Sequence, residues 1–268
     1  GAVGTSSQMS LTQQAITHFQ QSPPEKDTSY PEHTAWKSWQ IDSCEVFPCR
    51  LIEEKDIWEL IFTPSDYSSR WICAVDLSAG KIITPRFNGS MWKAANDQLL
   101  LETGGRYQLC DLNGSLTDVS IPHTGHVLAV DDQGYVLCQY PVTRTVRTDS
   151  GTMPYTFHQY TLLGPDFTVL QDGIDQYYNV GQYDYSYDSE LFYNDLAAVR
   201  VGASDWYLPD GGPWPRLYFN SKYMFIDRSG KTVSSSRYDE VSNKNDRWFG
   251  CHGTTEYLLD SNGNEREQ

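Results

Sequence analysis

The sequence lacks any uninterrupted apolar run of the roughly 20 residues that a membrane-spanning helix needs. It also lacks, near its N-terminus, the charged start, apolar stretch and small-residue cleavage site of a secretory signal. Residues 1–8 are small, polar and patternless, and we interpret them as a remnant of cloning ahead of Met9. These absences predict a protein that is not membrane-bound and that resides in the cytoplasm.

Basic residues are scarce relative to acidic ones. The 268-residue chain has 20 Lys and Arg against 35 Asp and Glu, which gives a formal charge of −15 and a pI of about 4.7. Such a chain is repelled by phosphate backbones and by anionic lipid headgroups. We therefore expect neither nucleic acid nor a membrane among its partners.

The motifs of the common cofactor enzymes are missing too. The sequence has no phosphate-binding Gly-rich loop, no dinucleotide fingerprint, no Gly-x-Ser-x-Gly elbow and no His-Glu-x-x-His. The close histidine pair His123 and His126 has no further ligand type in the next few residues, and the spacing of Cys44 and Cys49 matches no zinc knuckle. We expect no catalytic residue, no metal and no cofactor.

The six cysteines are scattered rather than paired in a framework. Cys73, Cys110 and Cys138 lie inside apolar, strand-like runs. Cysteines in that setting are typical of small buried hydrophobic residues in a reducing compartment. This pattern also favours the cytoplasm.

One helix is expected, at the N-terminal end. Ser10 is followed three residues later by Gln13, which is a capping-box arrangement, and Pro23 and Pro24 end the helical pattern near residue 21. The apolar residues on one helical face are Leu11, Ala15, Ile16 and Phe19. Residues 9–35 are therefore predicted to be a helix and a linker, and residues 36–268 a single domain of short strands.

A short unit recurs along the strand-rich part of the chain. It consists of apolar residues, an Asp, two or three further residues and a Gly, which predicts a hairpin turn that the Asp side chain caps and the Gly completes with a positive φ. The units end at Gly80, Gly114, Gly134, Gly230 and Gly263. Strands at this spacing with no helices between them predict antiparallel sheets that are closed or radially stacked.

Two units match over a longer stretch, residues 72–89 and 223–241. Both have apolar-Asp, a turn with Gly-Lys, an apolar residue, a spacer and then an aromatic followed by Asp or Asn. This order resembles the bacterial tryptophan-glycine repeat, although Tyr223-Met224 stands where Trp-Gly would be. The resemblance implies blade-like sheets and a binding role. We therefore predict an all-β protein, an irregular β-propeller-like array of antiparallel hairpin repeats with a short N-terminal helix.

Residues 166–215, predicted to be an elaborated segment, concentrate acidic and aromatic residues. Nine acids lie between positions 166 and 210, against Arg200 alone, and tyrosines alternate with them. Trp206, Tyr207 and Trp214 follow among prolines and glycines. Aromatic side chains are enriched at interface hot spots, and acids around them attract a cationic partner.

Several readings of this segment stay open. The alternation in residues 182–190 could place tyrosines against the core on one face of an edge strand with the acids in solvent, or the acids and aromatic residues could form an interaction face for a basic protein. Paired carboxylates beside aromatic rings would instead form a sugar site, and Asp184, Ser186, Asp188 and Glu190 alternate as calcium ligands do.

Among these readings, the composition is most similar to the immunity proteins that block polymorphic bacterial toxins. The predicted function is non-enzymatic binding of a basic toxin domain by a protein that is monomeric on its own. The alternative is a carbohydrate-active enzyme or lectin on a β-propeller scaffold. The predicted partner-binding residues are Asp184, Asp188, Glu190 and Asp195 for steering, with Tyr183, Tyr185, Tyr187 and Trp206 as anchors.

Overall fold

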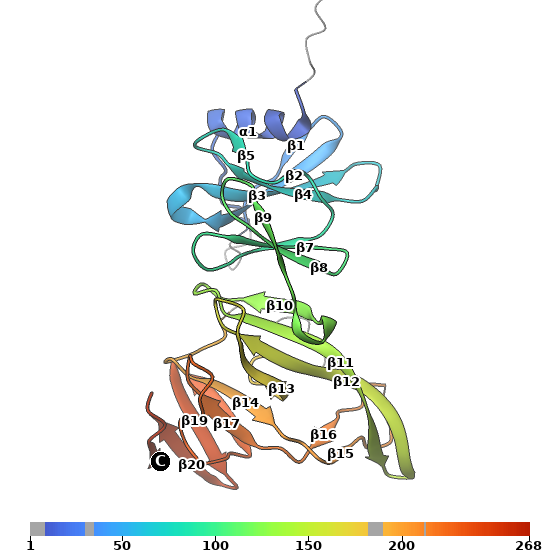
Figure 1. Ribbon diagram of the computed structural model, residues 1–268, viewed down its shortest axis with the longest axis vertical. Coiled ribbons are helices and arrows are strands. Elements are labelled where there is room, and N and C mark those ends of the chain that lie inside the picture. Colours follow the sequence, from blue (N-terminus) through green and yellow to red (C-terminus); the bar gives the residue numbers. More distant parts are fainter. Residues whose placement is uncertain (1–8, 30–34, 182–189, 212) are drawn as a thin grey trace, which may run out of the picture. The chain divides into compact units, whose positions relative to one another are not determined.

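The chain folds into two compact units, residues 1–119 and 120–268. The structure, a computed structural model, describes residues 9–29, 35–181, 190–211 and 213–268. Each unit has its own sheets and its own apolar clusters (Figure 1). The boundary between the units falls inside the range that was predicted as one β domain.

The described residues of the first unit form one α-helix and two antiparallel sheets. Helix α1 (Leu11–Gln21) begins as predicted, because Ser10 Oγ accepts a hydrogen bond from the Gln13 N–H at 3.2 Å. The five-stranded sheet follows chain order: β1 (Trp39–Ile41), β2 (Cys44–Ile52), β3 (Ile57–Pro64), β4 (Trp71–Asp76) and β5 (Lys81–Ile82), with the 3₁₀ turn η1 (Glu53–Lys55) between β2 and β3. The four-stranded sheet is β6 (Ser90–Lys93), β7 (Leu99–Thr103), β8 (Arg106–Cys110) and β9 (Leu116–Val119).

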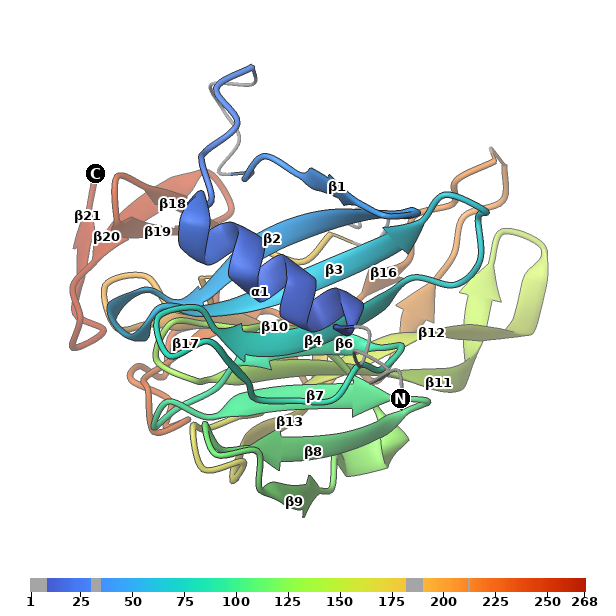
Figure 2. The same ribbon diagram turned by 90° about the horizontal axis from the view of Figure 1, so that it is seen from above.

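The five-stranded sheet is apolar on both faces. Along β3, Trp58, Leu60 and Phe62 belong to the cluster that α1 covers with Ala15, Ile16 and Phe19, and Figure 2 shows the helix lying across β2, β3 and β4. Ile57 and Ile61 point to the other side, where they join residues of β6, β7 and β8. Strand side chains alternate between faces, so Glu59 faces this second cluster.

The second unit is built on an eight-stranded sheet. Its order is β16-β15-β11-β12-β13-β14-β17, with β10 also paired to β11. The strands are β10 (His126–Val130), β11 (Val136–Thr148), β12 (Gly151–Leu163), β13 (Val169–Tyr177), β14 (Ala197–Val201), β15 (Trp206–Tyr207), β16 (Tyr218–Phe219) and β17 (Tyr223–Ile226), after the 3₁₀ turn η2 (Pro122–Thr124). A four-stranded sheet follows, with β18 (Glu240–Lys244), β19 (Arg247–His252), β20 (Thr255–Leu259) and β21 (Glu265–Glu267).

The predicted Asp-Gly turns are confirmed. In four of them the Asp Oδ1 accepts hydrogen bonds from the N–H groups two and four residues later, and the Gly has a φ between 80° and 89°. The capping residues are Asp111, Asp131, Asp227 and Asp260. The turn at Asp76 is one residue longer and ends at Gly80, with a φ of 65°.

The two longest sequence matches share one strand plan. Ile72 and Phe87 exchange backbone hydrogen bonds at 2.8 and 2.9 Å, and Tyr223 and Tyr238 make the same pair at 2.9 Å. Each pair leads into a four-stranded sheet that runs in chain order, β6–β9 in one case and β18–β21 in the other. We call residues 72–119 and 223–267 the two modules, because they share this strand plan.

In both modules a turn glycine packs on the preceding hairpin. A Cβ on Gly114 would lie 2.8 Å from the carbonyl oxygen of Ile83, and a Cβ on Gly263 would lie 2.8 Å from that of Val233. Ile83 and Val233 each follow the glycine of the earlier turn by three residues. Each glycine therefore has two roles: it adopts the positive φ of its own turn, and it lacks the Cβ that would prevent the close approach of the preceding hairpin.

The mostly β fold with one short N-terminal helix and several antiparallel sheets agrees with the prediction. Within the described part of the chain, none of the four sheets closes into a barrel, and no closed propeller is identified. All six cysteines are free, and Cys73, Cys110 and Cys138 are buried in strands as predicted.

Candidate functional site: the β15–β16 surface

Of the eight predicted partner-binding residues, the structure describes Glu190, Asp195 and Trp206. Tyr183, Asp184, Tyr185, Tyr187 and Asp188 lie outside the described residues. Glu190 and Asp195 are exposed, whereas Trp206 is half-buried. Asp195 pairs with Arg228, whereas Trp206 lies in β15 opposite Phe219, so the two residues have different neighbours.

Two acids of residues 166–210 are paired with arginines from elsewhere in the chain. Asp195 forms an ion pair with Arg228 at 2.7 Å. Asp205 accepts two hydrogen bonds from Arg147, each at 2.9 Å, which is the bidentate geometry of a strong pair. The local excess of negative charge is therefore smaller than the count of acids against Arg200 predicts.

Asp172 has a similar structural role. His123 Nε2 lies 2.8 Å from its Oδ2, and the His123 ring stacks on Tyr140 at 3.9 Å between centroids. Burial alone raises the pKa of Asp172, but its hydrogen bonds with His123, Thr161 and the Gly173 N–H hold that pKa below its usual range. The histidine that was considered as a metal ligand thus contacts a carboxylate of the sheet.

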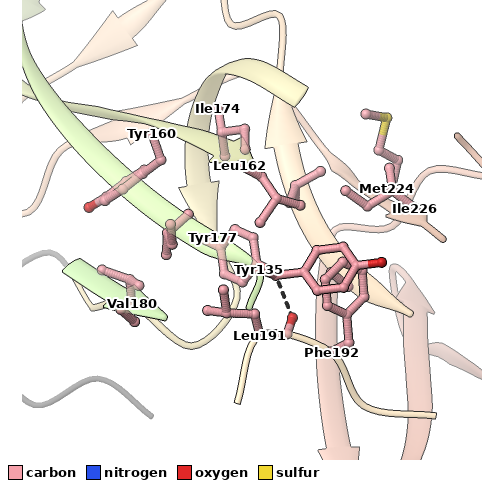
Figure 3. Packing of buried hydrophobic residues seen from close by; sticks show 14 residues of the cluster. Tyr135, Tyr160, Leu162, Ile174, Tyr177, Val180, Leu191, Phe192, Met224 and Ile226 are labelled. Carbon is pink, nitrogen blue, oxygen red and sulfur yellow. Dashed lines mark hydrogen bonds between the residues drawn. The ribbon is translucent and has the colours of Figure 1, made fainter. Parts of the chain in front are cut away.

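Three of the described tyrosines of the segment, Tyr177, Tyr178 and Tyr193, pack into the protein. Tyr177 is buried and donates a hydrogen bond to the carbonyl of Leu191 at 2.6 Å (Figure 3). Tyr178 and Tyr193 pack edge-on against Trp248, whose indole N–H donates to the Tyr193 carbonyl at 2.7 Å. The alternating tyrosines Tyr183, Tyr185 and Tyr187, for which an edge strand was considered, lie outside the described residues.

The exposed aromatic surface lies instead around β15 and β16. The long β11–β12 hairpin, visible in Figure 1, extends beyond β10, and near its end Arg147 pairs with Tyr207 of β15. β15 then pairs with β16 through Trp206–Phe219 and Tyr207–Tyr218. We call Arg147, Asp149, Asp205, Tyr207, Trp214, Tyr218 and Phe219 the β15–β16 surface.

Two aromatic side chains of the β15–β16 surface are strongly exposed. Trp214 is 77% exposed and Tyr218 is 49% exposed. A hollow of about 360 Å³ adjoins Tyr218 and is lined by Arg147, Asp205, Tyr207, Phe219 and Asn220. Trp206 lies beneath, packed with Val146 and Leu208, and Arg144 sits 5.8 Å from its ring.

Hydrogen bonds determine the protonation states of the ionisable side chains in and beside this hollow. Arg147 lowers the pKa of Asp205 by hydrogen bonding, and Tyr207 does the same for Asp149. The bond to Asp149 in turn raises the pKa of Tyr207, because a phenolate would face a carboxylate. At neutral pH the hollow therefore presents ionised Arg147 and Asp205 beside the neutral phenol of Tyr207, which donates its hydrogen bond to the ionised Asp149.

A second pocket, of about 160 Å³, lies where β12 and β13 diverge. Its walls are mostly aromatic, and Asp175 is the one carboxylate among its described lining residues: Tyr155, Thr156, Phe157, His158, Tyr160, Asp175, Gln176, Val180, Leu217 and Phe219. Glycoside hydrolysis needs two carboxyl groups about 5–10 Å apart. The described lining supplies one of them.

Sequence reasoning found Trp206, Tyr207 and Trp214 but missed Arg147, Asp149, Tyr218 and Phe219. Arg147 and Asp149 reach the surface only because β11 pairs with β15 in parallel, and no local pattern signals that pairing. The signal that could have found Tyr218 and Phe219 is the aromatic pair that follows the proline-rich stretch.

No group of three metal-ligating side chains occurs among the residues that the structure describes. In the same ranges, no helix is both long enough and apolar enough to cross a membrane. Neither a protein-family model nor a curated protein sequence matches this chain.

Proposed function

We propose that this chain is a non-enzymatic, cytoplasmic protein-binding protein that neutralises a basic bacterial toxin domain, as an immunity protein does. The observation that carries the proposal is the β15–β16 surface, where Tyr218 is exposed beside a hollow and Trp214 is exposed on the segment that joins β15 to β16. Exposed tryptophan and tyrosine offer a large contact area at a low cost in conformational entropy. Aromatic residues of this kind are enriched at protein–protein interfaces.

The charge of the chain supports a basic partner. A net charge of −15 creates an attractive field that speeds the encounter with a cationic protein. Because Asp195 and Asp205 are paired within the fold, this field belongs to the whole chain more than to one cluster. In the proposal Asp184, Asp188, Glu190 and Asp195 contribute to steering, with Tyr183, Tyr185, Tyr187 and Trp206 as further anchors.

The proposal includes the finer architecture as well. We take the hairpins as an irregular, propeller-like stack of repeats related to the tryptophan-glycine repeat. The two modules at 72–119 and 223–267, with turn glycines packed on the preceding hairpin, support a repeat origin. A repeat scaffold would hold the β15–β16 surface rigidly, which lowers the entropy cost of binding.

Co-expression tests the proposal. The chain should restore the growth of cells that express the toxin domain encoded beside its own gene. The variant Trp214→Ala/Tyr218→Ala should lose this protection while remaining folded, because both side chains are largely exposed. The matched control is Tyr67→Asn, which removes an aromatic that is 98% exposed in the other unit and should leave protection intact. Absence of protection by the wild-type chain, or full protection by the double variant, would contradict the proposal.

A further inference from the structure

Strand β12 has an unpaired edge beside the second pocket. β12 pairs with β11 along its whole length but with β13 only from Tyr160 onward. In an antiparallel pair every second residue directs its N–H and C=O to the same edge. The backbone groups of Tyr160 are directed toward β13, so those of Thr156 and His158 are directed to the same edge. No strand of the described chain pairs with Thr156 or His158 on that edge.

Nearer the turn, the same edge is protected by a proline. The backbone of Pro154 is directed to the same edge of β12 as the backbones of Thr156 and His158, but proline has no N–H group that could pair with an added strand. Both Thr156 and His158 are exposed. The open length is therefore short and lies directly at the mouth of the pocket that these two residues line.

A buried carboxylate lies inside this pocket. Asp175 is only 4% exposed and accepts hydrogen bonds from Gln159 Nε2 at 3.0 Å and from the Ala203 N–H at 2.9 Å. Burial raises the pKa of Asp175, and the Ala203 N–H offsets part of that rise. The nearby cation Arg200 directs its hydrogen bonds to the carbonyls of Phe219 and Ser221 instead.

The other groups of the pocket suit the side chain of a lysine. Tyr155, Phe157 and Phe219 are apolar walls for a methylene stem, and aromatic faces attract an ammonium group. The volume is below the roughly 300–1,000 Å³ of small-molecule sites, so it fits one side chain.

We propose that the β12 edge binds an extended segment of a basic partner at Thr156 and His158, and that a lysine of this segment enters the pocket and pairs with Asp175. Tyr155, Phe157 and Gln159 lie on one face of β12, and Gln159 contacts Asp175. An added strand would direct alternate side chains to that face. The inference rests on the proposed function, because it specifies which element of the basic partner is recognised.

The test uses the full chain, labelled with ¹⁵N, and the peptide acetyl-Thr-Val-Lys-Val-Thr-amide. The peptide should shift the amide signals of Thr156, His158 and Ala203. A matched peptide with norleucine in place of lysine keeps the stem and loses the charge, and it should bind at least about tenfold more weakly. This comparison is made on the wild-type chain, so it does not depend on how any variant folds.

Two variants extend the test. Asp175→Asn should abolish the preference for lysine over norleucine. Thr156→Pro removes the N–H group that is directed to the open edge, and it should abolish binding of both peptides. The control is Thr152→Pro, which removes an N–H group directed to the same edge but farther from the pocket, and it should leave binding intact. Equal affinity for the two peptides, no binding up to about 10 mM, or shifts of the same amides by N-acetylglucosamine oligomers instead would overturn the inference.

The two proposals can fail separately. If the lysine peptide binds as expected but the toxin domain does not, the proposed function fails and the lysine pocket stands. If the toxin domain binds wild type, Asp175→Asn and Thr156→Pro equally, the lysine pocket fails and the proposed function stands.

Discussion

Single aspartates and glycines define the hairpins of this protein. The Asp227 carboxylate accepts hydrogen bonds from the N–H groups of Ser229 and Lys231, and Asp260 does the same for Asn262 and Asn264. The glycine between these donors has a positive φ, which is strained for other residues. Such turns can be predicted from the sequence because all the residues that determine them lie within five positions.

A pair of glycine substitutions separates turn strain from packing between hairpins. Gly253 (φ 60°) has nothing within 4 Å of an added Cβ, whereas the Cβ at Gly263 (φ 80°) would lie 2.8 Å from the Val233 carbonyl oxygen. Gly253→Ala should lower the free energy of unfolding by about 1 kcal/mol, and Gly263→Ala by about 2–4 kcal/mol. Urea denaturation of both variants gives the comparison. Equal losses would mean that the close approach contributes nothing.

Glu59 should make stability depend on pH. Burial beside Ile57 and Ile61 raises the pKa of Glu59 from 4.5 to about 7, against the smaller opposite effect of Arg70. The folded state then holds a proton that the unfolded state has released. The stability contribution of this residue is therefore greatest below pH 4.5, falls as the pH rises to about 7 and is constant above that.

The variant Glu59→Gln removes this dependence. Above pH 7 it should unfold with a free energy larger than that of wild type by up to about 3 kcal/mol, and the difference should vanish near pH 4. Denaturation curves across this range measure it, with the exposed Glu54→Gln as the control that changes little. A constant difference between Glu59→Gln and wild type at all pH values would refute the assignment.

Among the elements, β19 connects the C-terminal sheet to the eight-stranded sheet through Trp248. This buried indole packs against Tyr178 and Phe225 and donates to the Tyr193 carbonyl. Trp248→Ala should cost about 3–5 kcal/mol, and Trp248→Phe, which loses mainly the hydrogen bond, about 1–2 kcal/mol. Chemical denaturation followed by far-UV circular dichroism measures both. Near-wild-type stability of Trp248→Ala would show that the two sheets are independent.

The elements that the sequence predicts best are those with local causes. The helix at Leu11–Gln21 and the Asp-capped turns follow from capping and turn chemistry. The buried strand cysteines follow from apolar runs. In each case the determining residues lie within one element.

The candidate site was less predictable because its residues meet through long-range pairing. Arg147 reaches Asp205 from 58 positions away, and Arg228 reaches Asp195 from 33. A count of charges within residues 166–215 cannot include these partners. The pocket at Asp175 likewise exists because β12 and β13 diverge after a register shift, and a register shift leaves no simple mark in composition.

At the scale of the whole molecule, charge sets the expected kinetics of binding. Replacing Asp184, Asp188, Glu190 and Asp195 by Asn or Gln would reduce a net charge of −15 by four. The association rate with the basic partner should fall by about tenfold at low salt, and its dependence on salt should flatten. Stopped-flow fluorescence measures both. An unchanged rate would show that these acids take no part in steering.

The most direct test of the central claim is the pair of rate constants for binding of the neighbouring toxin domain to wild type and to Trp214→Ala/Tyr218→Ala. We expect wild type to associate more slowly as salt rises from about 0.05 M to about 0.3 M. We expect the double variant to keep this association rate and to dissociate about 100-fold faster, because hot-spot aromatics act mainly on dissociation. Identical dissociation rates for the two proteins would contradict the claim that the β15–β16 surface is the binding site.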